Sequence, residues 1–292
     1  MKTQTLTICL LVLTVTNLYS QIKSIAVDSG YVNVDGGKLY YEMAGNGKNI
    51  VLLHDGMVDR QIWNEQFFEY AKNYRVIRYD RRAYGRSSNP QTNYSHIDDL
   101  YQVFNQLKID KAIIFGMSSG GGLAIDFTLK YPEKVSGLVL VGAVVGGYGY
   151  SAHFITRGGH FDRAIYSNSE KVQKYFVEID PYEIVPKNTQ AKEKVKKIME
   201  GAIPTDIRND GYYPFRPERT AVKFLSEIKV PTLILVGEFD IPDVHAHSGV
   251  INAGIENSKR EIIPNSAHLI PIEQPGLFNE AVNKFLKEFI NK

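Results

Sequence analysis

Cysteine is almost absent from this chain, which has only one, Cys9, among 292 residues. Cys9 lies in an N-terminal segment that we predict to be removed, so the mature protein would have neither a disulfide nor a cysteine nucleophile. An excess of one charge is lacking as well, because 34 basic residues stand against 32 acidic ones. The sequence has no basic stripe with interleaved aromatics, no repeat and no low-complexity tract. Nucleic acids and anionic membranes are therefore not expected as partners.

Long hydrophobic runs are also missing, and the most apolar stretch is short. Leu6–Leu18 is too short to span a bilayer well, and it follows the positively charged start Met1-Lys2. Ser20, a small residue, stands before Gln21. The pattern predicts a secretory signal peptide over residues 1–20, cleaved after Ser20, and a secreted or periplasmic protein without a stable membrane span. An uncleaved membrane anchor is the alternative.

The rest of the sequence has the composition of an ordinary globular protein, with 43% apolar and 23% charged residues. Apolar runs typical of buried strands alternate with helical patterns. This alternation predicts an α/β fold, with a doubly wound, mostly parallel sheet of about eight strands and helices on both faces. The expected strands lie at 31–34, 39–41, 50–53, 74–79, 111–115, 135–141, 230–236 and 260–263, the first two forming a hairpin.

A Gly-x-Ser-x-Gly sequence, GMSSG at 116–120, lies between a predicted strand and a predicted helix. In that context the chain turns sharply, and the serine hydroxyl is exposed above the sheet. Gly116 and Gly120 are needed because a β-carbon at either position would clash where the strand and the helix almost touch. Ser118 is therefore the predicted nucleophile, and a plain Gly/Ser-rich loop is the alternative.

A serine needs a base and an orienting acid to act as a nucleophile. Asp240 and His268 each follow a predicted strand, and the carboxyl ends of parallel strands lie at one edge of a sheet. The order serine, acid, histidine is the one that this strand–turn–helix setting requires. We predict that Ser118 attacks, that His268 is general base and then acid, and that Asp240 holds the imidazole. Asp243 competes for the acid role, but its position after Pro242 favours a helix cap.

These elements resemble the α/β-hydrolases, in particular the large serine-esterase-like group, from about Tyr31 to the C-terminus. Besides the GMSSG turn, the matching blocks are VLLHDG at 51–56, YDRRAYGRSS at 79–88, VGEFDIPD at 236–243 and NSAHLIPIEQP at 265–275. The resemblance implies a hydrolase that uses the three residues above.

The resemblance also implies a helical cap between Val141 and Val230, where the strand rhythm breaks. We place the cap at 146–222 and the hydrolase core at 21–145 and 223–292. Two helical patterns lie in the cap range, one with apolar residues from 172 to 179 and one from 191 to 199. The lysines of the second pattern are expected to form a solvated face rather than an anion site.

In this family two backbone N–H groups bind the oxyanion, and the resemblance assigns one of them to Ser119. The other is carried over to Gly56, with Met57 as the neighbouring candidate. Asp55 departs from the family pattern, which has glycine at that place. Since a carboxylate would repel a developing oxyanion, we expect Asp55 to point away. His54 is expected to hold the loop by hydrogen bonds.

Asp243, His245 and His247 have the residue types of a metal site, but the segment is typical of a helix start. On a helix, His245 and His247 would not share a face. We therefore predict no metal and no cofactor.

The expected activity is that of a serine hydrolase, which cleaves a small ester, thioester or lactone through an acyl-enzyme. Cleavage of a carbon–carbon bond with the same triad is the alternative within the family. A ligand-binding receptor on a hydrolase scaffold is the alternative from another class. In each case the partner is a small molecule, and the sequence does not indicate an oligomeric state.

Overall fold

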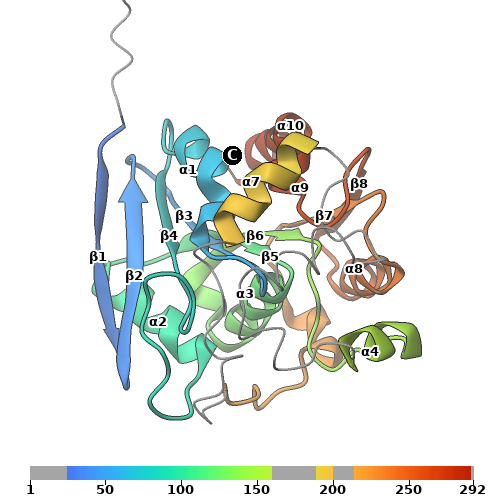
Figure 1. Cartoon of the computed structure of the whole chain (residues 1–292), viewed down its shortest axis with the longest axis horizontal. Helices are drawn as coiled ribbons and strands as arrows, with labels where there is room; N and C mark the ends of the chain where they lie inside the picture. Colours follow the sequence, from blue (N-terminus) through green and yellow to red (C-terminus); the bar gives the residue numbers. More distant parts are fainter. Residues whose placement is uncertain (1–24, 160–188, 200–213, 291–292) are drawn as a thin grey trace, which may run out of the picture.

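The computed structural model describes residues 25–159, 189–199 and 214–290 (Figure 1). The predicted signal peptide and the cap pattern at 172–179 lie outside these residues. Both stay predictions, as do the cap boundaries at 146 and 222.

One mixed sheet of eight strands organises the described residues, in the order β1-β2-β4-β3-β5-β6-β7-β8. The pairs β1–β2 and β2–β4 are antiparallel, and every later pair is parallel. The prediction of a mostly parallel sheet of about eight strands is therefore confirmed. The strands are β1 (Val27–Val34), β2 (Gly37–Ala44), β3 (Asn49–Leu53), β4 (Arg75–Tyr79), β5 (Ala112–Met117), β6 (Val135–Val141), β7 (Thr232–Gly237) and β8 (Ser258–Ile263).

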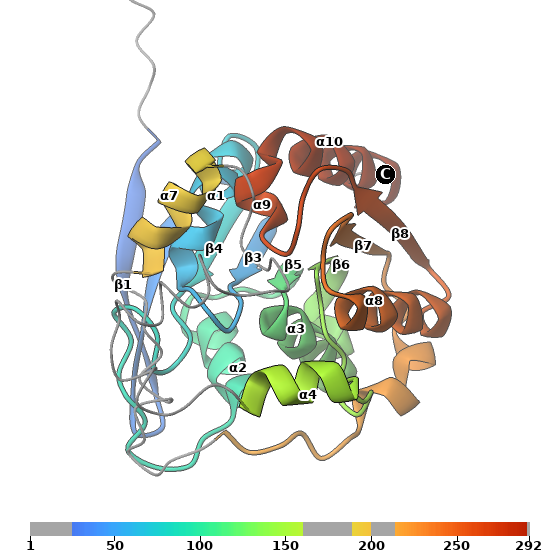
Figure 2. The same cartoon turned by 45° about the vertical axis from the view of Figure 1, so that its right-hand side comes forward.

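Helices cover both faces of this sheet, as Figures 1 and 2 show. Side chains alternate along β3, so Ile50 and Leu52 join one apolar core while Val51 and Leu53 join the other. The first core is closed by η1 (Arg60–Trp63), α1 (Asn64–Tyr70), α7 (Thr189–Met199), α9 (Ile270–Glu273) and α10 (Pro275–Phe285). The second is closed by α2 (His96–Gln106), α3 (Ser119–Lys130) and α8 (Pro242–Gly254).

Two described helices fall within the predicted cap range. The helical pattern at 191–199 is confirmed as α7, whose Ala191, Val195, Ile198 and Met199 are buried in the first core. The other helix, α4 (Ala152–Gly159), lies near α8 in Figure 1. Among the described residues, no helix has both the length and the apolar character needed to cross a membrane.

The parallel strands end at one edge of the sheet, and the predicted site residues follow them there. Ser118 comes directly after β5, Asp240 follows β7, and His268 follows β8. The fold thus places three residues that are far apart in sequence at the same edge.

Candidate active site

Ser118 occupies a strained turn between the last residue of β5 and the first residue of α3. Its φ of 51° and ψ of −116° are unfavourable for a residue with a β-carbon. The Ser118 N–H donates to the Val141 carbonyl at 2.9 Å, and the Ser118 carbonyl accepts from Gly121 and Gly122. These hydrogen bonds hold the strained conformation, which directs the side chain away from the strand–helix junction.

The glycines around Ser118 allow a very close approach of backbone segments. A β-carbon on Gly116 would lie 2.6 Å from the Gly120 carbonyl oxygen. One on Gly120 would lie 2.4 Å from the carbonyl oxygen of His54, at the end of β3. The predicted need for glycine at both positions is confirmed, and at Gly120 the neighbour is β3 rather than β5.

Asp240 and His268 form a buried hydrogen-bonded pair. His268 Nδ1 lies 2.9 Å from Asp240 Oδ2 and 3.1 Å from Oδ1. Burial lowers the pKa of His268, but the charge and hydrogen bond of Asp240, together with the nearby Asp55 and Glu273, outweigh burial, so the pKa is raised. Because Asp240 engages Nδ1, Nε2 is the nitrogen through which His268 can exchange a proton.

The end of β6 contacts both Ser118 and the histidine–aspartate pair. The Val141 carbonyl accepts the Ser118 N–H, and the next residue is Gly142. A β-carbon on Gly142 would lie 3.0 Å from His268 Nδ1 and 3.2 Å from Asp240 Oδ2. The structure therefore brings Ser118, Asp240 and His268 together around residues 141 and 142.

The loop after β3 lies beside Ser119. A β-carbon on Gly56 would be 3.3 Å from Ser119 Oγ, so the two residues assigned to the oxyanion site are neighbours. Asp55 Oδ1 accepts the N–H groups of Met57 at 2.7 Å and of Val58 at 2.8 Å. The N–H of the alternative donor Met57 is thus bound to Asp55, which favours Gly56, and the identity of the donor stays a prediction.

Residues 49–275 match the family model described as the alpha/beta hydrolase fold, which is more than half of the chain. The chain belongs to the alpha/beta hydrolase fold family. The expected fold and the expected hydrolase class are thereby confirmed at the level of the family.

Several relatives of this hydrolase are similar over almost their whole length. The 2-hydroxy-6-oxo-6-(2'-aminophenyl)hexa-2,4-dienoic acid hydrolase of Metapseudomonas resinovorans is 27% identical, over 88% of this chain and 90% of its own. The 2-hydroxy-6-oxononadienedioate/2-hydroxy-6-oxononatrienedioate hydrolase of Klebsiella pneumoniae is 28% identical, over 91% and 98%. A solved structure described as an N-acyl homoserine lactone degrading enzyme has a TM-score of 0.68 and 26% identity, over 88% and 100%.

His54 and Arg81 brace the loops of the hydrolase on either side of Gly56. His54 Nδ1 lies 2.7 Å from the Asp55 carbonyl oxygen, and the Arg81 N–H donates to His54 Nε2 at 2.9 Å. Burial lowers the pKa of His54 well below its usual value, so the ring is neutral and can accept at Nε2. Arg81 also donates from its guanidinium to Ser119 Oγ at 3.0 Å. The expected loop-bracing role of His54 matches these contacts.

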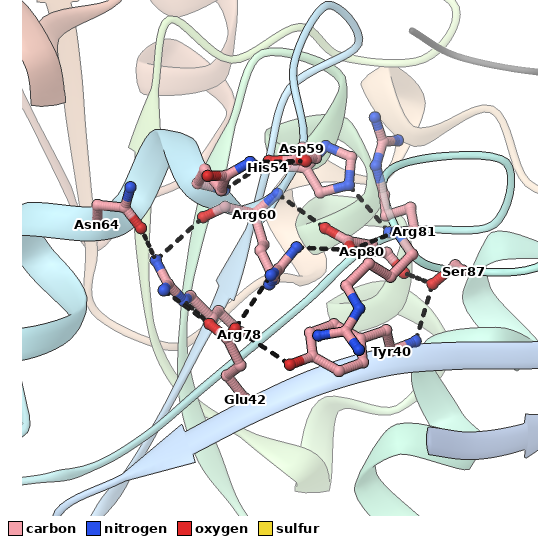
Figure 3. Close-up of polar contacts among 12 residues, drawn as sticks. Tyr40, Glu42, His54, Asp59, Arg60, Asn64, Arg78, Asp80, Arg81 and Ser87 are labelled. Carbon is pink, nitrogen blue, oxygen red and sulfur yellow. Dashed lines mark hydrogen bonds and ion pairs between the residues drawn. The ribbon is translucent and has the colours of Figure 1, made fainter. Parts of the chain in front are cut away.

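Figure 3 shows the ion pairs that hold the segment carrying Arg81. Arg60 pairs with Asp80 at 2.8 Å and with Glu42 at 3.0 Å, and Arg78 pairs with Glu42 at 2.7 Å. These side chains come from β2, β4, η1 and the loop after β4. All four side chains are buried or nearly so. The network therefore fixes the end of β4 and the position of Asp80, which directly precedes Arg81.

Asp243 has a different role from the one predicted. It lies in the first turn of α8, but it accepts the N–H and the Oγ–H of Ser151 at 2.6 and 2.8 Å, so it anchors the start of α4. The helix expected at this place is present. His247 Nδ1 accepts the Val145 N–H, and His245 Nδ1 lies 3.2 Å from the Arg260 guanidinium.

Glu273 supports His268, and sequence reasoning gave it no role. Its Oε2 accepts the Ala267 N–H at 2.8 Å and its Oε1 accepts the Leu269 N–H at 3.0 Å, so one carboxylate holds both neighbours of His268. Burial raises the pKa of Glu273 to about 7, although these two hydrogen bonds oppose the rise. Its position five residues after a predicted catalytic histidine was the available sequence clue.

We expect Glu273→Gln to make stability less dependent on pH. In the folded protein Glu273 keeps its proton up to a pH of about 7, whereas in the unfolded chain it loses the proton near 4.5. The folded state binds more protons in this window, so the stability contribution of Glu273 falls as pH rises from 4.5 to 7. The difference between wild type and variant should change by on the order of 1 to 3 kcal/mol across the window, measured by urea unfolding at a series of pH values.

Glu280→Gln provides the matched control, because Glu280 is exposed on the adjacent helix α10. The control should reproduce the wild-type pH profile. If Glu273→Gln also reproduced the wild-type profile, the conclusion that the pKa of Glu273 is raised in the folded protein would be wrong.

Proposed function

We propose that this hydrolase cleaves small esters, thioesters or lactones through Ser118, His268 and Asp240. The observation that carries the proposal is the buried Asp240–His268 pair beside Ser118, which is held in a strained turn at the same strand edge. A buried carboxylate on Nδ1 keeps the imidazole in the tautomer that can accept a proton at Nε2. The strained turn exposes the nucleophile to a carbonyl carbon.

In the first half of the reaction, Ser118 Oγ attacks the carbonyl carbon and His268 Nε2 accepts the hydroxyl proton. Asp240 stabilises the imidazolium that forms. The negative charge on the carbonyl oxygen is bound by the N–H groups of Ser119 and Gly56. This assignment is supported by the short distance between the two residues. His268 then gives its proton to the leaving alcohol or thiol, and an acyl-enzyme remains.

In the second half, His268 accepts a proton from water while the water oxygen attacks the acyl carbon. The proton is returned to Ser118 Oγ as the acid leaves. Asp55 is buried near this site, and burial raises its pKa although the hydrogen bonds from the Val58 and Met57 N–H groups oppose the rise. Its Oδ1 is bound to the amides of Met57 and Val58, which directs that oxygen to its own loop rather than to the oxyanion.

Labelling with a fluorophosphonate tests this proposal, because the reagent reacts covalently with an activated serine hydroxyl. We expect wild-type protein and Ser119→Ala to be labelled and Ser118→Ala to remain unlabelled, since Ser119 contributes only its N–H. Mass spectrometry of the labelled peptide identifies the modified residue. Folded wild-type protein that takes up no label would favour a ligand receptor and would remove the support for a hydrolytic serine.

A carbon–carbon bond hydrolase is the second candidate. It is favoured by the 27% and 28% identity with hydrolases named for 2-hydroxy-6-oxo unsaturated acids. The lactone-degrading enzyme, at 26% identity, supports the first candidate instead. Rates on p-nitrophenyl esters, a lactone and a 2-hydroxy-6-oxo dienoic acid, each measured with Ser118→Ala as the blank, distinguish the two.

A further inference from the structure

A cavity of about 730 Å³ begins beside the predicted oxyanion donors and runs along α3. Gly56 and Ser119 are among its lining residues. Its volume lies within the range of small-molecule sites in proteins. Neither Ser118 nor His268 is among the described residues that line this cavity. The cavity is therefore a region next to the candidate active site and not the place of the reacting side chains themselves.

One face of α3 forms a wall of the cavity. The lining residues of α3 are spaced by three or four positions, as residues on one helix face are. They are Ser119, Gly122, Leu123, Asp126 and Lys130, with Leu129 beside them. Other elements add apolar surface through Ile97 and Val144. The cavity therefore offers a mostly apolar wall with a few charged side chains among its lining residues.

Asp126 is the unusual member of this wall. Within the described residues, no hydrogen bond or ion pair holds its carboxylate. Four cations also line the cavity. Lys130 pairs with Asp98 at 2.7 Å, Arg219 pairs with Glu227 at 2.6 Å, and Arg81 donates to the Asp55 carbonyl and to Ser119 Oγ, while Arg216 is exposed. Burial raises the pKa of Asp126 to about 7. A carboxylate without a partner at such a place is unfavourable for stability, which favours a role in binding.

We propose that this cavity is a substrate subsite in which Asp126 binds a protonated amine of the substrate. A cation is the partner that an unpaired, partly buried carboxylate binds most strongly. Seven residues separate Ser119 from Asp126, which corresponds to about 10 Å along the axis of α3. The inference rests on the proposed function, and it adds that the preferred ester or lactone carries an amino group about 10 Å from its reacting carbonyl carbon.

The test uses two series of chromogenic esters, one with the variable end on the acyl chain and one with it on the alcohol. In each series the chain spans about 10 Å and ends in an ammonium, a hydroxyl, a methyl or a carboxylate group. We expect wild-type kcat/KM to be highest for the ammonium ester in one of the two series. Asp126→Asn should lower that value by about 10- to 100-fold and change the methyl ester by less than about threefold.

Two comparisons make this result specific. Glu133→Gln removes an exposed carboxylate near the end of α3 and outside the cavity, and it should keep the wild-type preference. The carboxylate ester should be the poorest substrate of the wild type and should improve in Asp126→Asn, because a like-charge repulsion is removed. An equal preference for the hydroxyl ester would overturn the assignment of a charged ligand.

The subsite and the catalytic proposal fail separately. Ser118-dependent cleavage of the methyl ester without any preference for the ammonium ester would overturn the subsite and leave the hydrolase proposal intact. If no ester is cleaved, calorimetry with hexylamine tests the subsite alone. Heat of binding that is lost in Asp126→Asn supports the subsite, and equal heats in both proteins overturn it.

Discussion

Ser118→Ala is expected to lower kcat/KM by about 10⁴-fold or more on any ester that the wild type cleaves. The reason is that the variant removes the atom that attacks, while the oxyanion donors and the binding surface remain. Their residual contribution leaves a slow reaction with water rather than none. Initial rates on a p-nitrophenyl ester, with active wild-type enzyme quantified by titration, measure the loss.

His268→Ala should cause a loss of similar size, because serine and base act as one unit. For the same reason we expect the double variant, Ser118→Ala with His268→Ala, to have a kcat/KM within about threefold of that of the slower single variant. Ser119→Ala keeps its backbone N–H and loses only the hydroxyl that Arg81 contacts, so a loss of at most about tenfold is expected. Losses that multiplied in the double variant would argue against a shared step of Ser118 and His268.

Gly237→Ala is expected to reduce both stability and activity. Gly237 ends β7, three residues before Asp240, and a β-carbon there would lie 1.9 Å from the Ala267 carbonyl oxygen and 2.6 Å from that of Ser266. These backbone atoms can move away only if the loop that carries His268 shifts. We expect the free energy of unfolding to fall by about 3 kcal/mol, since overpacking against backbone is not relieved by a rotamer change.

The displaced loop should also separate His268 from Asp240, so activity should fall beyond what the unfolded fraction explains. Urea unfolding gives the first quantity and rates at low urea give the second. Gly249→Ala is the matched control, because a β-carbon at Gly249 in α8 would meet nothing within 4 Å. That variant should be unchanged or more stable by up to about 1 kcal/mol. Equal stability of the two variants would refute the packing argument.

Strand positions could be predicted well from the sequence, whereas the ends of elements could not. The buried strands β3, β5, β6 and β7 are continuous apolar runs, a pattern that local composition reveals. Residues 60–70 have the apolar spacing of one helix, but they form two elements, η1 and α1. Asp59 caps the first of these by accepting the Gln61 N–H, a local competition that apolar spacing does not show.

In the candidate site, too, some residues could be predicted from the sequence and others could not. Ser118, Asp240 and His268 could be found because each stands where a predicted strand ends, next to residues with recognisable turn chemistry. The oxyanion loop could not be worked out, because the availability of the Met57 N–H depends on the rotamer of Asp55. Glu273 was missed since its bonds to Ala267 and Leu269 exist only after the chain turns into α9.

The sequence by itself determined the fold class, the sharp turn at Ser118 and the order of the three predicted site residues. These follow from apolar periodicity and from glycines at fixed spacing, which act within a few neighbouring residues. Only the tertiary structure decided that Arg81 joins the Gly56 loop to Ser119, that Glu273 supports His268, and that Asp126 lines a cavity with no partner among the described residues. Each of these depends on atoms from distant segments meeting within hydrogen-bond range or failing to do so, and no local pattern encodes that.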